Sequence, residues 1–463
     1  MYKISSYRKM ILISLASLFL FSACLEMEDP DDLSPDEVLK EILPLSQRTL
    51  TYWKTAEIGR YSAIWTQQLA GVRGIEQTID RYDPPHTATN KMWSEHYNYV
   101  NLYFKNLIYY ATEANSKAYR GIGRILQAYS IGLMTDAFGH IPFSEADKYL
   151  SAHEDPGYDD QEMILLHIIE ILDAAIVDLQ NALNGEGMVP GPAEDHMYGG
   201  DLNQWMKAAR MLQIRYMTRF AHFRQEYTSL YSAVQETGLF TSNADNLIYS
   251  LPDMRGSENP YYHYDLNIRN TRVGQQLVNM LKETNDPRLP RLVKMNTNNE
   301  YVGSLPGESK FEASLRGNAV AGRYAPIVFL SYPELKFLQA EAFYRYGEQA
   351  MADQAYTEGV KASLEWFGAE NPQWVQEHAY KENVSLQQII EAKYIALFMQ
   401  QEVWADYRRT GFPELIPFEE VSEEIPRRKL YPEDELTHNP HNVYQDETIF
   451  DRVWWDDSPY EIR

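Results

Sequence analysis

Residues 334–367 read ELKFLQAEAFYRYGEQAMADQAYTEGVKASLEWF, and this stretch decides the fold. It predicts a helix that carries Ala340 and Tyr344, a short turn at Gly347, and a second helix that carries Ala355 and Tyr356. The small residues let two antiparallel helices approach closely, and the tyrosines fill the gap between them. The stretch therefore predicts a closely packed helix pair.

This pair resembles a tetratricopeptide unit, whose period is about 34 residues. Two further pairs, 91–114 with 117–136 and 160–184 with 201–226, are expected to stack in a similar way as a small solenoid. Additional helices are expected over residues 35–59, 271–283, 331–347, 350–367 and 384–406.

Strand signals are few, and we expect short strands only near 247–251 and 326–329. Residues 286–326 are rich in Gly, Pro, Asn and Ser and predict an irregular excursion, and the chain after residue 407 is interrupted by prolines. Because no linker divides the chain, we expect one helical body with long loops.

The charge of the chain excludes some functions. Its 463 residues hold 42 Lys and Arg against 66 Asp and Glu, which gives a net charge of −24. Such a surface argues against nucleic acid as a partner, because phosphate backbones need Lys and Arg. With a single cysteine, Cys24, the chain has no internal disulfide and no cysteine-based metal centre.

The N-terminus predicts where the protein is located in the cell. A basic segment precedes the apolar run MILISLASLFLF at residues 10–21, which is shorter than the roughly 20 residues of a membrane span. Small residues and Cys24 follow. We interpret residues 1–23 as a lipoprotein signal peptide, with Cys24 as the acylated N-terminus that tethers the protein. An ordinary secretory signal or an uncleaved anchor is the alternative.

Four segments resemble signatures of the SusD/RagB family of nutrient-binding outer-membrane lipoproteins, and the RagB-like branch most of all. They are GLMTDAFGHIPFSEA at 132–146, YGGDLNQWMKAARMLQIRYM at 198–217, SYPELKFLQAE at 331–341 and EVWADYRRTGFP at 402–413. The ending IPRRKLYPEDELTHNP, from Ile425, is similar to an Arg-Tyr-Pro-x-x-Glu pattern of the family. The acidic residues 24–34 resemble the export signal of Bacteroidetes surface lipoproteins.

The resemblance implies a mostly α-helical SusD-like fold, with four tetratricopeptide-like helix pairs, long loops and short β-hairpins. It implies one nutrient-binding domain over residues 35–463, behind the acidic tether at 24–34. The implied function is binding of an oligosaccharide as the lid of a SusC-like TonB-dependent transporter at the outer membrane, without catalysis. No cofactor is expected, and a structural Ca²⁺ held by loop carboxylates stays open.

The signature residues themselves have a structural interpretation. Gly199 and Gly200 predict a turn before an N-cap at Asp201. Arg408 and Arg409, close to Asp406, are interpreted as ion-paired packing residues. We therefore look for the ligand site elsewhere in the chain.

Sugars bind on flat aromatic rings beside amides and charged groups that contact their hydroxyls. Two stretches, 61–93 and 253–272, combine these residue types. The candidate ligand-binding residues are Trp65, Gln67, Arg73, Tyr82, Trp93, Tyr261, Tyr262, Asn267 and Arg272, with Trp65 as the first choice. For each aromatic residue, packing of a loop onto a helix is the alternative.

Other functions stay open. A peptide-binding lid would need an apolar groove or a strand edge in place of stacked rings. A surface glycoside hydrolase would need a pair of carboxylates at a suitable separation, and 66 acidic residues offer candidates. A helical scaffold without a small ligand is the last alternative. No catalytic motif or metal-ligand spacing is found in the sequence.

Overall fold

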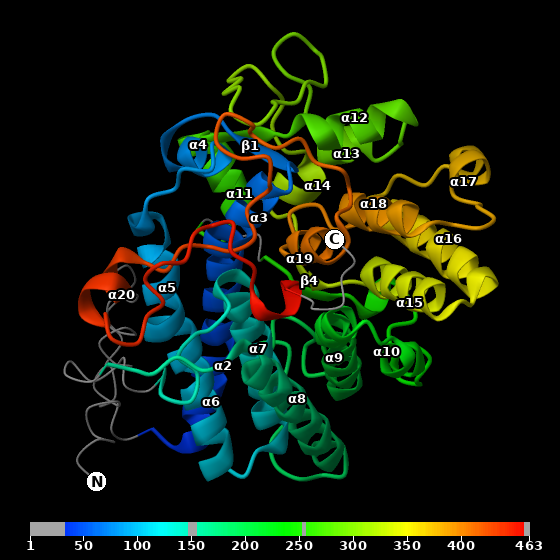
Figure 1. The fold of residues 1–463 in the computed structure, drawn as a ribbon. Helices are drawn as coiled ribbons and strands as arrows, with labels where there is room; N and C mark the ends of the chain where they lie inside the picture. Colours follow the sequence, from blue (N-terminus) through cyan, green and yellow to red (C-terminus); the bar gives the residue numbers. More distant parts are fainter. Residues whose placement is uncertain (1–32, 147–154, 252–255, 458–463) are drawn as a thin grey trace.

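The computed structural model describes residues 33–146, 155–251 and 256–457. Helices fill most of the molecule, and loops with short helices form a layer at the top of Figure 1. The predicted signal peptide, Cys24 and nearly all of the acidic tether lie outside the described residues. Within the described part, none of the helices has both the length and the apolar character needed to cross a bilayer.

The α-helices fall into a long group and a short group. The long helices are α2 (Pro35–Trp53), α6 (Asn101–Glu113), α7 (Lys117–Phe138), α8 (Gln161–Leu183), α9 (Leu202–Arg224), α15 (Tyr332–Tyr346), α16 (Gln349–Trp366) and α18 (Leu386–Ala396). The short helices are α3 (Gly59–Trp65), α4 (Gly74–Asp80), α5 (Asn90–Glu95), α10 (Thr228–Ala233), α11 (Pro260–His263), α12 (Gln275–Glu283), α13 (Leu289–Leu292), α14 (Asn318–Ala321), α17 (Pro372–His378), α19 (Glu402–Thr410) and α20 (Glu433–His438).

The predicted helix pairs are confirmed. Helix α6 packs on α7, α8 on α9, and α15 on α16, and α7 also packs on α8, so that the pairs stack on one another. Their side chains form one continuous buried core. The mostly α-helical fold class expected from the sequence is therefore the one observed.

Helix starts follow the capping residues in the sequence. The Asp201 side chain accepts hydrogen bonds from the backbone N–H groups of Asn203 and Gln204, and so begins α9. Before it, Gly199 and Gly200 adopt positive φ angles of 63° and 88°, as the predicted turn requires.

The two expected strands are present as β2 (Leu247–Tyr249) and β4 (Ile327–Leu330), which pair antiparallel. A second pair, β1 (Leu69–Gly71) with β3 (Thr271–Val273), was not expected. The helix predicted over 271–283 is wrong in its first residues, because the Thr271–Val273 segment is β3 and α12 begins only at Gln275. β-branched residues such as Thr271 and Val273 suit a strand.

The single helix predicted over 384–406 is also wrong. It is two helices, α18 and α19, separated by residues 397–401. Met399 in this connection has a φ of 71°, which is incompatible with a continuous helix. The break leaves Gln401 to donate to the carbonyl oxygen of Leu133 in α7 (3.0 Å), and α19 turns toward the core.

A buried ion cluster joins the helices that carry the signature segments. Arg219 on α9 contacts Asp136 of α7 (2.8 Å) and Glu402 of α19 (2.6 Å). On the same helix, Arg215 pairs with Glu334 of α15 at 2.7 Å. Four helices are therefore held together by charges that are shielded from water.

The cluster continues along α19. Arg409 pairs with Glu341 of α15 (2.6 Å) and with Asp406 (2.7 Å), which also accepts from Lys393. This confirms the packing interpretation of Arg409. Arg408 also packs, but it donates to backbone carbonyls of Asp136 and Arg427, and its guanidinium carbon lies 3.8 Å from the centre of the Trp404 ring.

Candidate ligand-binding face

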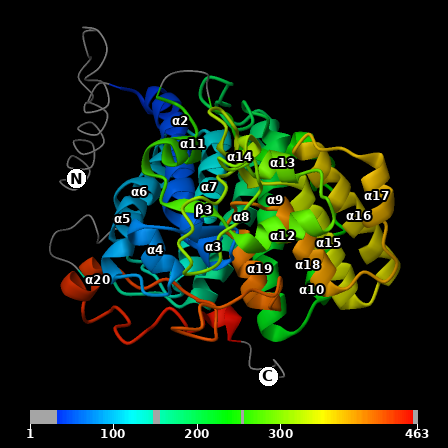
Figure 2. The same cartoon turned by 90° about the horizontal axis from the view of Figure 1, so that it is seen from above.

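The two stretches selected from the sequence meet in space. Strands β1 and β3 pair so that Ala70 lies opposite Arg272, which brings residues 61–93 against residues 256–272. Figure 2 shows α4, β3 and α12 on the near side when the molecule is viewed from above. The loop layer thus gathers side chains that are about 200 positions apart in the sequence.

A close backbone approach places Arg73 at the surface. A Cβ atom on Gly71 would lie 1.8 Å from the carbonyl oxygen of Glu76, so the chain can turn directly from β1 into α4 only with glycine there. The turn exposes Arg73, whose Nε donates to Asn270 Oδ1 (2.8 Å) and whose Nη2 donates to Ile268 O (2.6 Å).

The centre of this region is Phe311, which lies in the excursion 286–326. Its ring is 44% exposed. The Arg272 guanidinium carbon lies 4.2 Å from the ring centre and that of Arg73 lies 5.4 Å from it. Arg272 Nε also donates to the Phe311 carbonyl oxygen (2.8 Å), which fixes the ring over β3.

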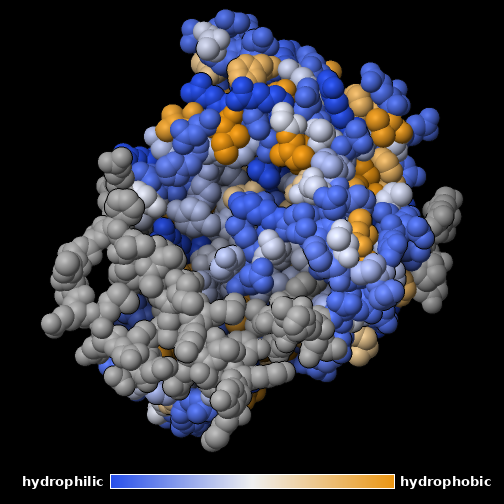
Figure 3. Space-filling view, turned by 90° about the vertical axis from the view of Figure 1, so that its left-hand side faces the viewer, coloured by the Kyte–Doolittle hydropathy of each residue, from blue (hydrophilic) through white to orange (hydrophobic). Residues whose placement is uncertain are grey.

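We call this surface the loop face and define it by Arg73, Asn267, Ile268, Arg272 and Phe311. Arg73 and Asn267 are exposed, Ile268 is an exposed apolar residue, and Arg272 is buried beneath the ring. An apolar ring flanked by guanidinium and amide groups is the pattern of a site for a polar ligand with flat faces. Figure 3, a side view, shows apolar patches set among hydrophilic residues on the upper part of the molecule, where the loop layer lies.

Phe311 was not among the candidates from the sequence. It is the one aromatic residue between Tyr301 and Tyr324, in a loop excursion that has no helical or strand period. That isolation in a polar loop is the signal that points to it, by the same reasoning that selected Tyr261 and Tyr262.

Trp65, the first choice, lies in the core. Its ring is 1% exposed, packs 5.1 Å from the Trp404 ring centre and donates from Nε1 to Ile79 O (3.1 Å). Trp93 is also buried and packs on Phe138. Neither ring offers a face to a ligand from solution, so both belong to the packing alternative.

Gln67 and Tyr82 shape the loops from inside. Both adopt positive φ angles of 57° and both are buried. The Gln67 amide donates to Ile416 O and accepts from Ile416 N, which pins the loop after α19. Tyr82 packs edge-on against Phe418 at 6.3 Å. These residues position the loop layer and do not contribute to its exposed surface.

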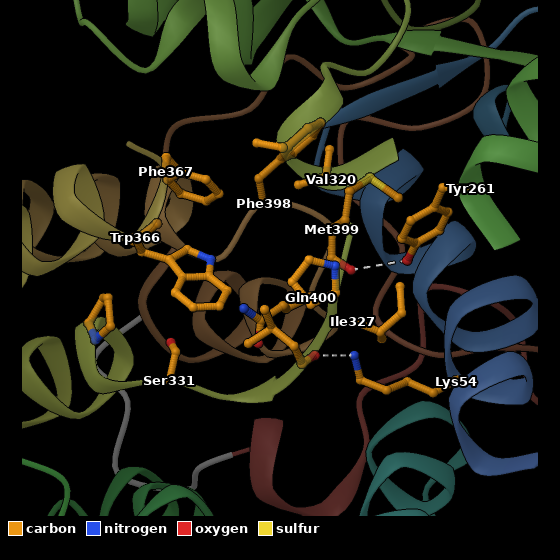
Figure 4. Close-up of a pocket in the computed structure, with 15 residues that line it drawn as sticks. Lys54, Tyr261, Val320, Ile327, Ser331, Trp366, Phe367, Phe398, Met399 and Gln400 are labelled. Atoms are coloured by element: carbon orange, nitrogen blue, oxygen red, sulfur yellow. Dashed lines mark hydrogen bonds between the residues drawn. The ribbon is translucent and has the colours of Figure 1, made fainter. Parts of the chain in front are cut away.

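Tyr261 and Tyr262 differ in direction. Both lie on the short helix α11, which turns Tyr261 inward and leaves Tyr262 half-buried. The Tyr261 hydroxyl reaches Met399 O (3.4 Å), as Figure 4 shows. The expectation was that the two rings cannot both face the core. Tyr261 faces the core and Tyr262 does not.

Figure 4 shows the cavity beside Tyr261, with Trp366, Phe367 and Phe398 around it and Lys54 at one side. Lys54 Nζ donates to Val328 O (2.7 Å), and burial lowers the pKa of Lys54 to about 7. The cavity measures about 40 Å³, which is room for a few water molecules. A sugar ring needs several times more space.

A larger hollow of about 220 Å³ lies between α12, α16, α17 and α18. Trp374 and His378 stack along it with ring centres 4.8 Å apart, and Tyr356 and Glu391 also line it. Burial raises the pKa of Glu391. This groove contains none of the residues proposed from the sequence.

Asp80 ties the excursion to α4. Its carboxylate accepts from Gly307 N at 2.6 Å, and it is buried, which raises its pKa to about 7. Nearby, Arg81 donates to Gly307 O (3.2 Å). The excursion that carries Phe311 is therefore held at its tip by an acid that is half protonated near neutral pH.

This acid gives a pH-dependent stability. Because the folded pKa lies above the unfolded value of about 3.9, the contribution of Asp80 is full at low pH and is lost as the pH rises toward 7. We expect the free energy of unfolding to fall between pH 5.0 and 7.5 by about 2–3 kcal/mol more than in the Asp80→Asn variant. Urea unfolding at both pH values measures this, and equal slopes in the two proteins would contradict it.

No three His, Cys, Asp or Glu side chains of the described residues lie in an arrangement that could hold a metal ion.

Comparison with known proteins gives a family and a fold. The SusD-like family model described as "Starch-binding associating with outer membrane" matches residues 39–432. No curated protein matches the chain.

Similar solved structures cover nearly the whole chain. A chitin-binding SusD homologue from Flavobacterium johnsoniae is 22% identical, with a TM-score of 0.76 over 90% of this chain and 98% of that one. A SusD/RagB family protein from Bacteroides thetaiotaomicron is 22% identical, with a TM-score of 0.74 over 92% and 100%. A SusD homologue from Bacteroides uniformis is 22% identical, with a TM-score of 0.75 over 90% and 99%. At such identities the likeness concerns the fold.

Proposed function

This chain belongs to the SusD-like family, and we propose that it is a non-catalytic oligosaccharide-binding lipoprotein of the outer membrane. The observation that carries the proposal is the loop face, where the exposed Phe311 ring lies beside the guanidinium groups of Arg73 and Arg272. The family description and the chitin-binding homologue support carbohydrate as the class of ligand.

Binding is the proposed mechanism. The C–H face of a sugar ring lies against Phe311, and the exposed Asn267 and Arg73 meet its hydroxyl groups. The protein is tethered at Cys24 and faces the cell surface, and it acts as the lid of a SusC-like TonB-dependent transporter. Weak binding suffices, because the transporter contributes a second surface once the lid closes.

A substitution of Phe311 tests the site. We expect Phe311→Ala to weaken oligosaccharide binding at least tenfold, about 1.4 kcal/mol, because the ring supplies the apolar platform. The measurement is calorimetry of the full chain in detergent, with chitin and starch oligosaccharides and then with the hits of a glycan array.

Tyr109→Ala is the matched control, since Tyr109 is 45% exposed but lies on α6, outside the loop layer. Equal affinity of the Phe311 variant and the unchanged protein would show that the loop face is not the oligosaccharide site. Purification of the protein from native membranes tests the proposed role as a lid. A preparation that never contains a TonB-dependent transporter would argue against that role.

A peptide ligand is the second candidate, and the 220 Å³ groove beside Trp374 is the observation that favours it. Its stacked rings and the Glu391 carboxylate suit an apolar or basic side chain of a peptide better than a sugar. Peptide-array hits that are lost in Trp374→Ala and kept in Phe311→Ala would promote this function over the first.

A further inference from the structure

The loop face carries positive charge on a chain whose net charge is −24. Arg73 and Arg272 of this face have Arg269 as a neighbour, and Arg272 donates to the carbonyl oxygen of Arg269 (2.9 Å). Within the described residues none of the three forms an ion pair. Their hydrogen bonds go to backbone carbonyls and to the Asn270 amide instead.

Three carboxylates of the surrounding loops pair with other cations. Asp265 pairs with Arg316, and its Oδ2 accepts from Arg316 Nε at 3.1 Å. Glu76 pairs with Arg60 (3.1 Å) and Glu308 with Lys310 (3.3 Å). None of these three acids forms an ion pair with Arg73, Arg269 or Arg272, and Asp265 acts on Arg272 only from a longer distance.

The three arginines repel one another electrostatically. Burial lowers the pKa of Arg272, Asp265 opposes this, and the neighbouring Arg269 and Arg73 lower it further. Such mutual repulsion is relieved by an anion placed among them.

The geometry is prepared for such a ligand. Two carbonyl oxygens hold Arg269 Nε, those of Asp265 and Leu266, and Arg269 itself has a φ of 59°. This left-handed conformation ends the helical turn Tyr264–Ile268 at Arg269. Arg73 and Arg269 remain exposed, and the Phe311 ring covers only the buried Arg272.

We propose that the loop face selects acidic oligosaccharides, whose carboxylate or sulfate groups pair with Arg73 and Arg269 while a sugar ring lies on Phe311. This inference rests on the proposed function. Planar guanidinium groups match both anions in a bidentate geometry. The overall charge of the chain repels such ligands, so their binding must come from a local site of this kind.

The experiment compares ligands that differ only in charge. Calorimetry of the full chain in detergent uses oligogalacturonate against its methyl ester, and sulfated dextran oligosaccharides against unmodified ones. We expect the charged form of at least one pair to bind tenfold or more tightly, with an affinity that falls as salt is raised. The two pairs separate carboxylate from sulfate.

The variants locate the effect. Arg269→Gln should weaken the charged ligand about tenfold and leave the neutral ligand within twofold. Arg73→Gln should weaken both ligands, and the charged one more strongly, because Arg73 also contacts the sugar hydroxyls. Arg224→Gln is the control, because Arg224 is 54% exposed and lies 5.3 Å from the Phe220 ring, but on α9. Circular dichroism checks that each variant is folded.

Three outcomes would overturn the inference. Equal binding of charged and neutral forms would refute it and leave the proposed function standing. Tight binding of the charged form that neither arginine variant changes would place the anion site elsewhere. Absence of any glycan binding, charged or neutral, would refute the inference and the proposed function together.

Discussion

Replacing Arg219 by methionine is expected to lower the free energy of unfolding by about 3–5 kcal/mol, because it breaks a buried ion cluster from one side only. Arg219 is fully buried and pairs with Asp136 and Glu402, and Trp455 Nε1 also donates to Asp136 (3.0 Å). Without the guanidinium group, Asp136 loses its ion pair in the core and Glu402 keeps only the longer contact with Arg215 (3.7 Å). Urea or thermal unfolding followed by tryptophan fluorescence measures the loss.

The matched control lies on the same helix. Arg224→Met removes an arginine from the exposed end of α9, where it pairs with Glu162 at 3.4 Å, and should change stability by less than about 1 kcal/mol. A loss of similar size in the two variants would mean that the Arg219 cluster has no special weight in holding the helices together.

The Arg219 effect should depend on pH. Burial alone would raise the pKa of Glu402, but Arg219 and Arg215 lower it to about 2. A depressed folded pKa stabilises the protein above the unfolded value of about 4.3, and this is lost as the pH falls toward 2. The cost of Arg219→Met should therefore shrink at acidic pH, where Glu402 in the variant can be protonated.

This cluster explains why the signature segments are informative about the family and not about the ligand. Asp136, Arg215, Glu334 and Glu402 each lie in one of the four segments quoted from the sequence. Their side chains meet in the core and set the angles between helices. A sequence shows the residue types, but the pairing of charges 80 to 180 positions apart depends on the packing.

The helices were predictable because their apolar residues repeat with a regular period and their ends carry capping residues. For α8 the stripe is continuous, and for α18 Ser385 begins the helix by capping Gln388 N. Predictions failed where tertiary structure decides. The break between α18 and α19 lies inside an apolar run, and β3 forms because β1 is there to pair with it.

The site was predictable in its segments and less so in its residues. Composition located residues 61–93 and 253–272, and the structure brings them together. Composition could not tell which aromatic side chains face inward, because Trp65 ends α3 between the apolar Ile64 and the polar Thr66, and this sequence allows either direction. Trp65 faces Trp404, and the exposed position in the loop layer belongs to Phe311.

The second large effect is expected from Asp195, an acid that was given no role in the sequence analysis. It is buried, and its two oxygens accept five hydrogen bonds: from Gln47 Nε2 (2.7 Å), Met197 N (3.0 Å), Tyr198 N (3.3 Å), Gly200 N (2.9 Å) and Trp205 Nε1 (2.7 Å). One carboxylate thus joins α2, the glycine turn and the start of α9.

Asp195→Ala should lower the free energy of unfolding by about 3–5 kcal/mol, because each buried donor left without an acceptor costs about 1–3 kcal/mol and some of them will find water. Asp195→Asn should cost nearly as much, since its amide N–H₂ would face donors on one side. Asp201→Ala, which removes only the cap of α9, should cost about 1 kcal/mol. Equal losses for Asp195→Ala and Asp201→Ala would show that the turn closes without the carboxylate. The expected difference would instead make Asp195 the point that sets α2 against α9, and with it the stacking of the helix pairs that support the loop face.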